Sequence, residues 1–258
     1  MQPTSPKLSS TTESTTNPAK TSKQAPFHAP SAIERLFEAL INGDRPASRS
    51  LVQEFRDSGL QADDVLSEVF WPTYEMIERL FRQEQLSNLS YRLATRLLRV
   101  LVDRTAGQLV RRPALGRTIF AVCGPTEADE LSAQIAVDLL EARGFDPVFA
   151  GGGVATDEIL AQVHEARPDV LLVFAAAPGD LPATREVIDK LREINATPDT
   201  QVVVGGGVFN RAEGLAEEIG ADLWASDPLE LVEVMVLEPD QRAIPEQQTV
   251  GRKRREAA

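Results

Sequence analysis

Two acidic residues, Glu127 and Asp129, stand shortly after an apolar run that ends at Cys123. Such a carboxylate pair offers hard oxygen atoms at the end of a predicted strand. The same residues also suit the first turn of a helix, because negative charge interacts favourably with the helix dipole there. The sequence favours the helical interpretation, and no catalytic residue is predicted. Cys123 is expected to be a small core residue.

Three consecutive glycines, Gly205, Gly206 and Gly207, follow a run of valines at 202–204. Because they lack side chains, they could let the nucleotide tail of a ligand approach the backbone. They could equally form a tight turn from strand to helix, and the sequence leaves both interpretations open. The alanines at 175–177 would leave room for a flat ring, although close helix packing is the favoured interpretation.

These residues lie at the ends of strands that the sequence predicts at 118–123, 146–150, 169–175, 201–205 and 221–225. Helical stretches separate the strands. The segment 169–177 is apolar after its first residue, which is typical of a strand covered on both faces. Five such units predict a doubly wound parallel sheet, with its ligand crevice at the carboxyl ends of the strands.

Residues 31–111 instead repeat apolar side chains at helical spacing. Residues 42–44 (Asn-Gly-Asp) end the first predicted helix, Gly59 ends the second, and Pro72 should kink or restart the third. A fourth helix runs from Leu89 to Val102. The predicted fold class is therefore α/β, with a four-helix bundle at 31–111 followed by a five-stranded flavodoxin-like sheet at 117–237.

The two ends of the chain differ from this pattern. Residues 1–29 are rich in Ser, Thr and Pro, and such a segment buries too little apolar surface to fold. It is predicted to be disordered. Residues 239–258 form a polar tail that ends in a basic run at 252–255, which is expected to be solvated.

Composition excludes several classes of function. The net charge of −12 argues against direct nucleic-acid binding through a general positive field. No apolar run is long enough to span a membrane, and no secretory h-region is recognised. The single cysteine rules out an intramolecular disulfide and fits a reducing compartment, so a cytoplasmic location is expected.

Four segments occur in the order and spacing of one known family: LFEALINGDRPASRSLVQEFRDSG at 36–59, DLLEARGFDPVFAGG at 138–152, VVVGGG at 202–207 and GADLWASDP at 220–228. The chain resembles the cobalamin (vitamin B12)-binding domain proteins. These include methionine synthase, corrinoid methyltransferase proteins and light-sensing repressors. The resemblance covers about residues 31–237 and implies cobalamin, and no other cofactor, between bundle and sheet.

The resemblance also implies site residues, with clear departures from the family pattern. The family has a DxHxxG motif after the first strand, and its histidine coordinates cobalt from below. Aligned through residues 138–141, this chain has Glu127, Asp129 and Ser132 at those positions. The two histidines, His28 and His164, lie elsewhere, so no residue is expected to bind the metal.

Light-sensing relatives hold the upper face of cobalamin with a tryptophan and a Glu-His pair. The corresponding residues here are Phe81, Tyr91 and Arg92. Together with the crevice residues, the set of residues expected to bind the cofactor is Phe81, Tyr91, Arg92, Glu127, Asp129, Ser132, Ala175, Gly205 and Gly206.

The predicted function is a sensor or regulatory protein of the cobalamin-binding type. No methyltransferase or mutase domain is recognised, so the chain is not expected to be an enzyme, and a regulatory protein partner is expected. One alternative is an interaction module of the same fold without a ligand. Another is a corrinoid carrier of a methyltransferase, although carriers usually rely on the histidine missing here. The oligomeric state is left open.

One other flat ring and two other α/β folds come into consideration. Heme would suit the same architecture, as in photosynthesis-gene anti-repressors, but no axial ligand is identified. A receiver domain needs an aspartate after the third strand, and residues 174–178 contain no acid. A dinucleotide-binding domain needs spaced glycines, and residues 124–126 are Gly-Pro-Thr instead.

Overall fold

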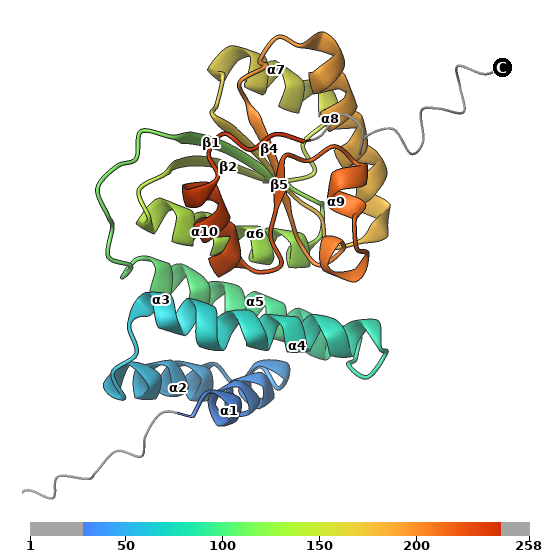
Figure 1. Cartoon of the computed structure of the whole chain (residues 1–258). Coiled ribbons are helices and arrows are strands. Elements are labelled where there is room, and N and C mark those ends of the chain that lie inside the picture. Colours follow the sequence, from blue (N-terminus) through green and yellow to red (C-terminus); the bar gives the residue numbers. More distant parts are fainter. Residues whose placement is uncertain (1–27, 244–258) are drawn as a thin grey trace, which may run out of the picture.

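The computed structural model describes residues 28–243. Residues 1–27 and 244–258, which hold most of both predicted tails and the whole basic run, lie outside the described residues. Figure 1 shows a helical part below and an α/β part above, joined by one connection before the first strand.

The helical part forms the predicted bundle. It consists of α1 (Ala29–Ile41), α2 (Arg45–Asp57), the continuous run of α3 (Ala62–Asp64), η1 (Val65–Phe70) and α4 (Trp71–Arg82), and α5 (Asn88–Ala106). Capping fixes several boundaries. The Asp44 carboxylate accepts a hydrogen bond from the Ala47 amide at 2.9 Å, and the Ser87 hydroxyl accepts one from the Ser90 amide at 3.0 Å.

Pro72 marks the change between two kinds of helix. The π-helical turn η1 ends at Phe70, and α4 begins at Trp71 with Pro72 in its first turn. Phe70 and Trp71 both have helical dihedral angles, and the Trp71 amide still donates to the Leu66 carbonyl. The helical run therefore continues past Pro72, which lacks an N–H and stands where the π-helical turn changes to α-helix. The helix does not restart at this proline.

The α/β part alternates strands and helices. The strands are β1 (Thr118–Cys123), β2 (Asp146–Gly152), β3 (Val170–Phe174), β4 (Gln201–Gly205) and β5 (Leu223–Trp224). The helices are α6 (Glu127–Ala142), α7 (Thr156–Ala166), η2 (Pro178–Asp180), α8 (Leu181–Ile194), η3 (Phe209–Arg211), α9 (Leu215–Glu218) and α10 (Pro228–Leu237). All strand pairs are parallel in the order β2-β1-β3-β4-β5, which confirms the predicted fold class.

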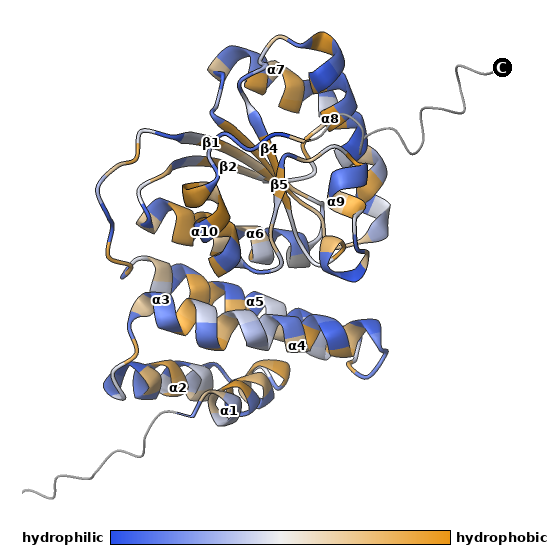
Figure 2. Ribbon diagram, viewed as in Figure 1, coloured by the Kyte–Doolittle hydropathy of each residue, from blue (hydrophilic) through white to orange (hydrophobic). Residues whose placement is uncertain are grey.

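Two apolar layers cover the sheet. Alternate residues of β3 face opposite sides, so that Leu172 and Phe174 pack toward α6 while Leu171 and Val173 pack toward α7 and α8. Figure 1 shows α6 between the sheet and the bundle, and α7 on the far side. Figure 2 shows the apolar residues gathered along the strands and on the inner sides of the helices. The core of the bundle continues into the α6 layer.

Asp138 on α6 is a half-buried acid with an incomplete set of hydrogen bonds. Gln134 Nε2 donates to its Oδ1 at 2.7 Å, while its Oδ2 has no partner within the described part of the chain. Burial raises the pKa of Asp138 to about 6 from an ordinary value of 3.8. The folded protein therefore binds this proton more tightly than the unfolded chain does.

We expect Asp138→Asn to stabilise the protein at neutral pH by about 1–2 kcal/mol, after allowance for partial solvent screening. The contribution of a raised carboxyl pKa is fully present below pH 3.8 and is lost as the pH rises through about 6. The advantage of the variant should therefore vanish in acid. Urea unfolding of both proteins at several pH values measures this, and a difference independent of pH would contradict it.

Within residues 28–243, the helices are too short or too polar to cross a lipid bilayer.

Candidate functional site between the bundle and the sheet

An open cleft of about 680 Å³ lies between the bundle and the carboxyl ends of the strands. The bundle wall consists of Glu78, Phe81, Arg82, Asn88, Tyr91 and Arg92, from α4 and α5. The opposite wall, called the floor below, consists of Pro125, Thr126, Ala176, Ala177 and Pro178, and Arg211 closes one side. This is the edge of a parallel sheet at which ligands bind in doubly wound folds.

A stacked aromatic pair forms the centre of the bundle wall. The rings of Phe81 and Tyr91 lie with centroids 3.9 Å apart and planes at 15°. Phe81 comes from the last turn of α4 and Tyr91 from the first turn of α5. The antiparallel helix pair therefore brings together residues that lie ten positions apart in the sequence.

Glu78 fixes the position of this aromatic pair. The Tyr91 hydroxyl donates to Glu78 Oε1 at 2.8 Å, and Arg82 lies 3.5 Å from Glu78 Oε2. Burial raises the pKa of Glu78, while the hydrogen bond from Tyr91 opposes that rise. The sequence did not single out Glu78. Its position one helical turn before Phe81 on the same helix was the available signal.

Asp129 lies beneath the floor rather than in the cleft. Its Oδ1 accepts a hydrogen bond from the Ala176 amide at 2.6 Å, and its Oδ2 accepts bonds from the amide, at 3.2 Å, and the hydroxyl of Thr126. The Asp129 side chain is fully buried, and this burial raises its pKa. Both oxygens therefore hold the two segments of the floor together, which leaves neither of them for a ligand in the cleft.

A capping box explains this orientation. Thr126 is the N-cap of α6, and its hydroxyl accepts a bond from the Asp129 amide at 3.2 Å, while Asp129 bonds back to Thr126. The segment aligned with the family motif is thus the first turn of a helix. The sequence Thr126-x-x-Asp129 carried the signal for this box. The side chain of Glu127 lies outside what the structure describes.

Ser132 connects α6 to the bundle. Its hydroxyl donates to the Asp129 carbonyl at 3.0 Å and shares a hydrogen bond with Tyr74 of α4. Both Ser132 and Tyr74 are buried. The bond between them therefore helps to set how the bundle sits on the α/β part.

The glycine triplet lies beside atoms of the protein itself. A Cβ atom on Gly205 would come within 2.9 Å of the Phe174 ring, and one on Gly207 would come within 2.9 Å of Arg211 Nη1. Gly206 has φ +107°, and its Cβ would lie 2.3 Å from the Ala175 carbonyl oxygen. Gly205, Gly206 and the buried Ala175 thus do not line the cleft.

The charge of the cleft is opposite to that of the whole chain. Arg82, Arg92 and Arg211 face a single lining carboxylate, Glu78, in a protein of net charge −12. Arg211 donates to the Ala176 carbonyl at 2.6 Å and lies against Gly207. Burial lowers the pKa of Arg211, and the nearby charge of Arg82 lowers it further. The cleft thus offers N–H donors to carbonyl, carboxylate or phosphate oxygens.

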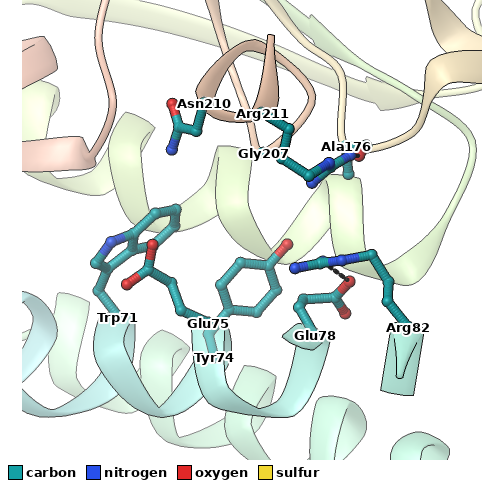
Figure 3. Close-up of a pocket in the computed structure, with 9 residues that line it drawn as sticks. All are labelled: Trp71, Tyr74, Glu75, Glu78, Arg82, Ala176, Gly207, Asn210 and Arg211. Carbon is teal, nitrogen blue, oxygen red and sulfur yellow. Dashed lines mark hydrogen bonds and ion pairs between the residues drawn. The ribbon is translucent and has the colours of Figure 1, made fainter. Parts of the chain in front are cut away.

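A side pocket of about 110 Å³ opens beside the cleft and shares Glu78, Arg82, Ala176 and Arg211 with it. Figure 3 shows Trp71, Tyr74, Glu75, Glu78 and Arg82 rising from α4 toward Arg211 and Asn210. The rings of Trp71 and Tyr74 lie 5.3 Å apart. Trp71, which stands ten residues before Phe81, therefore lines this pocket and not the main cleft.

No histidine reaches the cleft. His28 accepts a hydrogen bond at the start of α1, and His164 lies on α7, on the far side of the sheet. Across the part of the chain that the structure describes, no three His, Cys, Asp or Glu side chains are grouped to hold a metal ion. The cleft thus offers aromatic and cationic side chains to a large ring with polar edges, and the described residues of its floor include no histidine.

Comparisons with known proteins agree with this geometry. One B12 binding domain model matches residues 117–233, and a second one matches residues 32–104. A corrinoid protein of Desulfitobacterium hafniense is 22% identical over 214 residues, which cover 79% of this chain and 95% of that protein. Monomethylamine corrinoid protein 1 of Methanosarcina mazei is 20% identical over 208 residues, which cover 78% and 94% of the two chains.

The structure of the Methanosarcina barkeri monomethylamine corrinoid protein superimposes with a TM-score of 0.72 at 16% identity. The match covers 81% of this chain and 99% of that one, so the two proteins share the fold. Since the helical part and the α/β part each match a B12 binding domain, the chain belongs to the B12-binding domain proteins, with cobalamin as the cofactor that both matches support.

Proposed function

We propose that this chain is a corrinoid carrier, which holds cobalamin in the cleft and presents it to a methyltransferase partner. The observation that carries the proposal is the 680 Å³ cleft with its stacked Phe81–Tyr91 wall. The two relatives named above are called corrinoid proteins, and one is assigned to monomethylamine. The sensor function predicted from the sequence has no such support, so we favour the alternative prediction, a corrinoid carrier.

Each wall of the cleft has a role in this proposal. The stacked pair would cover one side of the ring and keep water from it, and Glu78 holds Tyr91 in place. Arg82, Arg92 and Asn88 would donate hydrogen bonds to the amide oxygens at the ring edge. When bound, cobalamin supplies a cobalt ion that can carry a methyl group.

The floor would support the ring, and it has no histidine that could coordinate the metal. Thr126 and Ala176 are held together by Asp129, so the surface beneath the ring is fixed but lacks an imidazole. The protein would therefore retain the corrinoid through contacts with its edges and faces. The chain would differ in this way from relatives that bind cobalt through a histidine, since imidazole is a far better ligand for cobalt than a carboxylate.

A second candidate is an interaction module of this fold that has no ligand. This candidate is favoured by the glycine triplet, because Phe174, Ala175 and Arg211 occupy the space beside the glycines that a ligand would need. In that case the cleft would receive side chains of another protein. Binding of cobalamin to the purified chain separates the two candidates.

Ala177→Trp tests the carrier proposal, because Ala177 is a half-buried floor residue with an extended backbone that accepts any side chain. We expect the indole to fill the cleft and weaken cobalamin binding about a hundredfold, which corresponds to about 2.7 kcal/mol. The matched control is Ala161→Trp at an exposed position of α7. Visible absorption after gel filtration measures retained cobalamin, and equal retention by Ala177→Trp and the control would refute the assignment of the cleft.

A further inference from the structure

The outer edge of β5 is open to another segment of chain. β5 is the last strand of the sheet and pairs with β4 on one side only, within the part of the chain that the structure describes. Trp224 in this strand is 37% exposed. The opposite edge strand, β2, contains Pro147 and a shift in register, which both act against further pairing. Proteins commonly cover or blunt such edges, so β5 is the edge for which a cover is expected.

Trp224 and Glu217 form a contact at this edge in which one carboxylate oxygen lacks a partner. The Trp224 indole donates to Glu217 Oε1 at 3.1 Å, while Oε2 is buried and accepts no hydrogen bond from residues 28–243. Glu213 and Glu218 add two exposed negative charges to the same segment. No arginine or lysine among the described residues forms an ion pair with these three glutamates. An exposed aromatic ring beside such carboxylates attracts a cation.

The described part of the chain ends beside this edge. The Ala243 amide donates to Asp222 Oδ1 at 2.8 Å, and Asp222 directly precedes β5. Arg192 of α8 also donates to Asp222 Oδ1, at 2.7 Å. The helices α8 and α9 pack in one apolar layer, on the side of the sheet away from α6 (Figure 1). The chain therefore leaves Ala243 on the side of the sheet where Trp224 meets α9.

The sequence after Ala243 carries charge of the opposite sign. Residues 252–255 are Arg-Lys-Arg-Arg, in a chain of net charge −12. The run begins nine residues after Ala243, and an extended chain rises about 3.3 Å per residue, so the connection can span about 30 Å. Trp224 lies only two residues after Asp222, where Ala243 is held. The basic run can therefore reach the edge of β5 in its own chain.

We propose that the basic run at 252–255 docks on the outer edge of β5 of the same chain, with a cationic side chain over the Trp224 ring. The inference stands whether or not the cleft holds a corrinoid. An arginine suits this position, because its planar group stacks on an aromatic ring while it compensates nearby carboxylates. The docked run would cover the edge and prevent its pairing with another chain. The run expected from the sequence to be solvated is thus assigned a place on the α/β part.

The fluorescence of Trp224 tests the proposal in the full-length protein. The chain has two tryptophans, so Trp71→Phe leaves Trp224 as the only one. In this parent, serine at all four positions 252–255 should make acrylamide quenching of Trp224 about twofold stronger, because no cation then covers the ring. Glu213→Gln combined with Glu218→Gln should act in the same direction. Salt at about 1 M should strengthen quenching in the parent and leave the serine variant unchanged, because it screens the attraction.

Two controls change charge elsewhere. Serine at Lys7, Lys20 and Lys23 removes three positive charges near the other end of the chain, and Glu34→Gln with Glu38→Gln removes two exposed acids from α1. Neither should alter the quenching, and circular dichroism checks that each variant is folded. Equal quenching in the parent and in the serine variant of 252–255 overturns the proposal. Protection of Trp224 that grows with protein concentration, together with an oligomer in gel filtration, would assign the edge to a second copy and also overturn it.

Discussion

Replacing Gly206 by leucine is expected to lower the free energy of unfolding by about 4 kcal/mol or more. Two effects add at this position. The backbone has φ +107°, a conformation that L residues rarely adopt, and the new Cβ would lie 2.3 Å from the Ala175 carbonyl oxygen. Since that oxygen belongs to the backbone at the end of β3, it cannot move without disturbing the sheet. Urea unfolding followed by circular dichroism measures the loss.

Gly214→Leu provides the control for this prediction. Gly214 also has a positive φ, of +76°, but a Cβ atom there would meet nothing within 4 Å. The free energy of unfolding of Gly214→Leu should therefore fall only by the cost of the backbone conformation, about 1–2 kcal/mol. If both variants lose the same amount, the close contact with Ala175 does not constrain the protein.

Asp129→Ala is expected to lower the free energy of unfolding by about 3 kcal/mol. The change removes the acceptor for the Ala176 amide and for both donors of Thr126, and with it the three hydrogen bonds that hold the two segments of the floor together. The floor of the cleft should loosen as a result, so cobalamin binding should weaken as well. Thermal or urea unfolding and the binding assay on the same variant measure the two effects.

Asp44→Ala is the matched control. Asp44 also caps a helix, with one bond to the Ala47 amide at 2.9 Å, but it lies at the surface of the bundle. Its loss should cost about 1 kcal/mol and leave cobalamin binding unchanged. An Asp129→Ala variant that is no less stable than Asp44→Ala would show that the buried bonds beneath the floor contribute little.

The fold could be predicted because it depends on local patterns. The strand predicted at 118–123 is Thr118–Cys123, and the one predicted at 201–205 is Gln201–Gly205. The apolar periodicity and the glycine and proline positions were sufficient for this. The last strand, predicted at 221–225, is only Leu223–Trp224, because it pairs with β4 alone at the edge of the sheet.

The site was harder to predict because its side chains meet through tertiary structure. Phe81 and Tyr91 were placed by resemblance, and their stacking follows from the antiparallel arrangement of α4 and α5. Arg211 reaches the cleft past Gly207, where a Cβ atom would come within 2.9 Å of its Nη1. No sequence pattern indicates that contact. The orientation of the Asp129 side chain could be predicted from the capping-box sequence. Its bond to Ala176 could not, because it joins segments 47 residues apart.

The central claim is that cobalamin occupies the cleft without a protein nitrogen bound to cobalt. Electron paramagnetic resonance of the Co(II) form, bound to unlabelled and to ¹⁵N-labelled full-length protein, tests it most directly. We predict a protein-bound signal whose nitrogen splittings are identical in the two samples, because no histidine lines the cleft. Splittings that change with the label would show a protein ligand on cobalt, and the absence of any protein-bound signal would show that the cleft does not hold the cofactor.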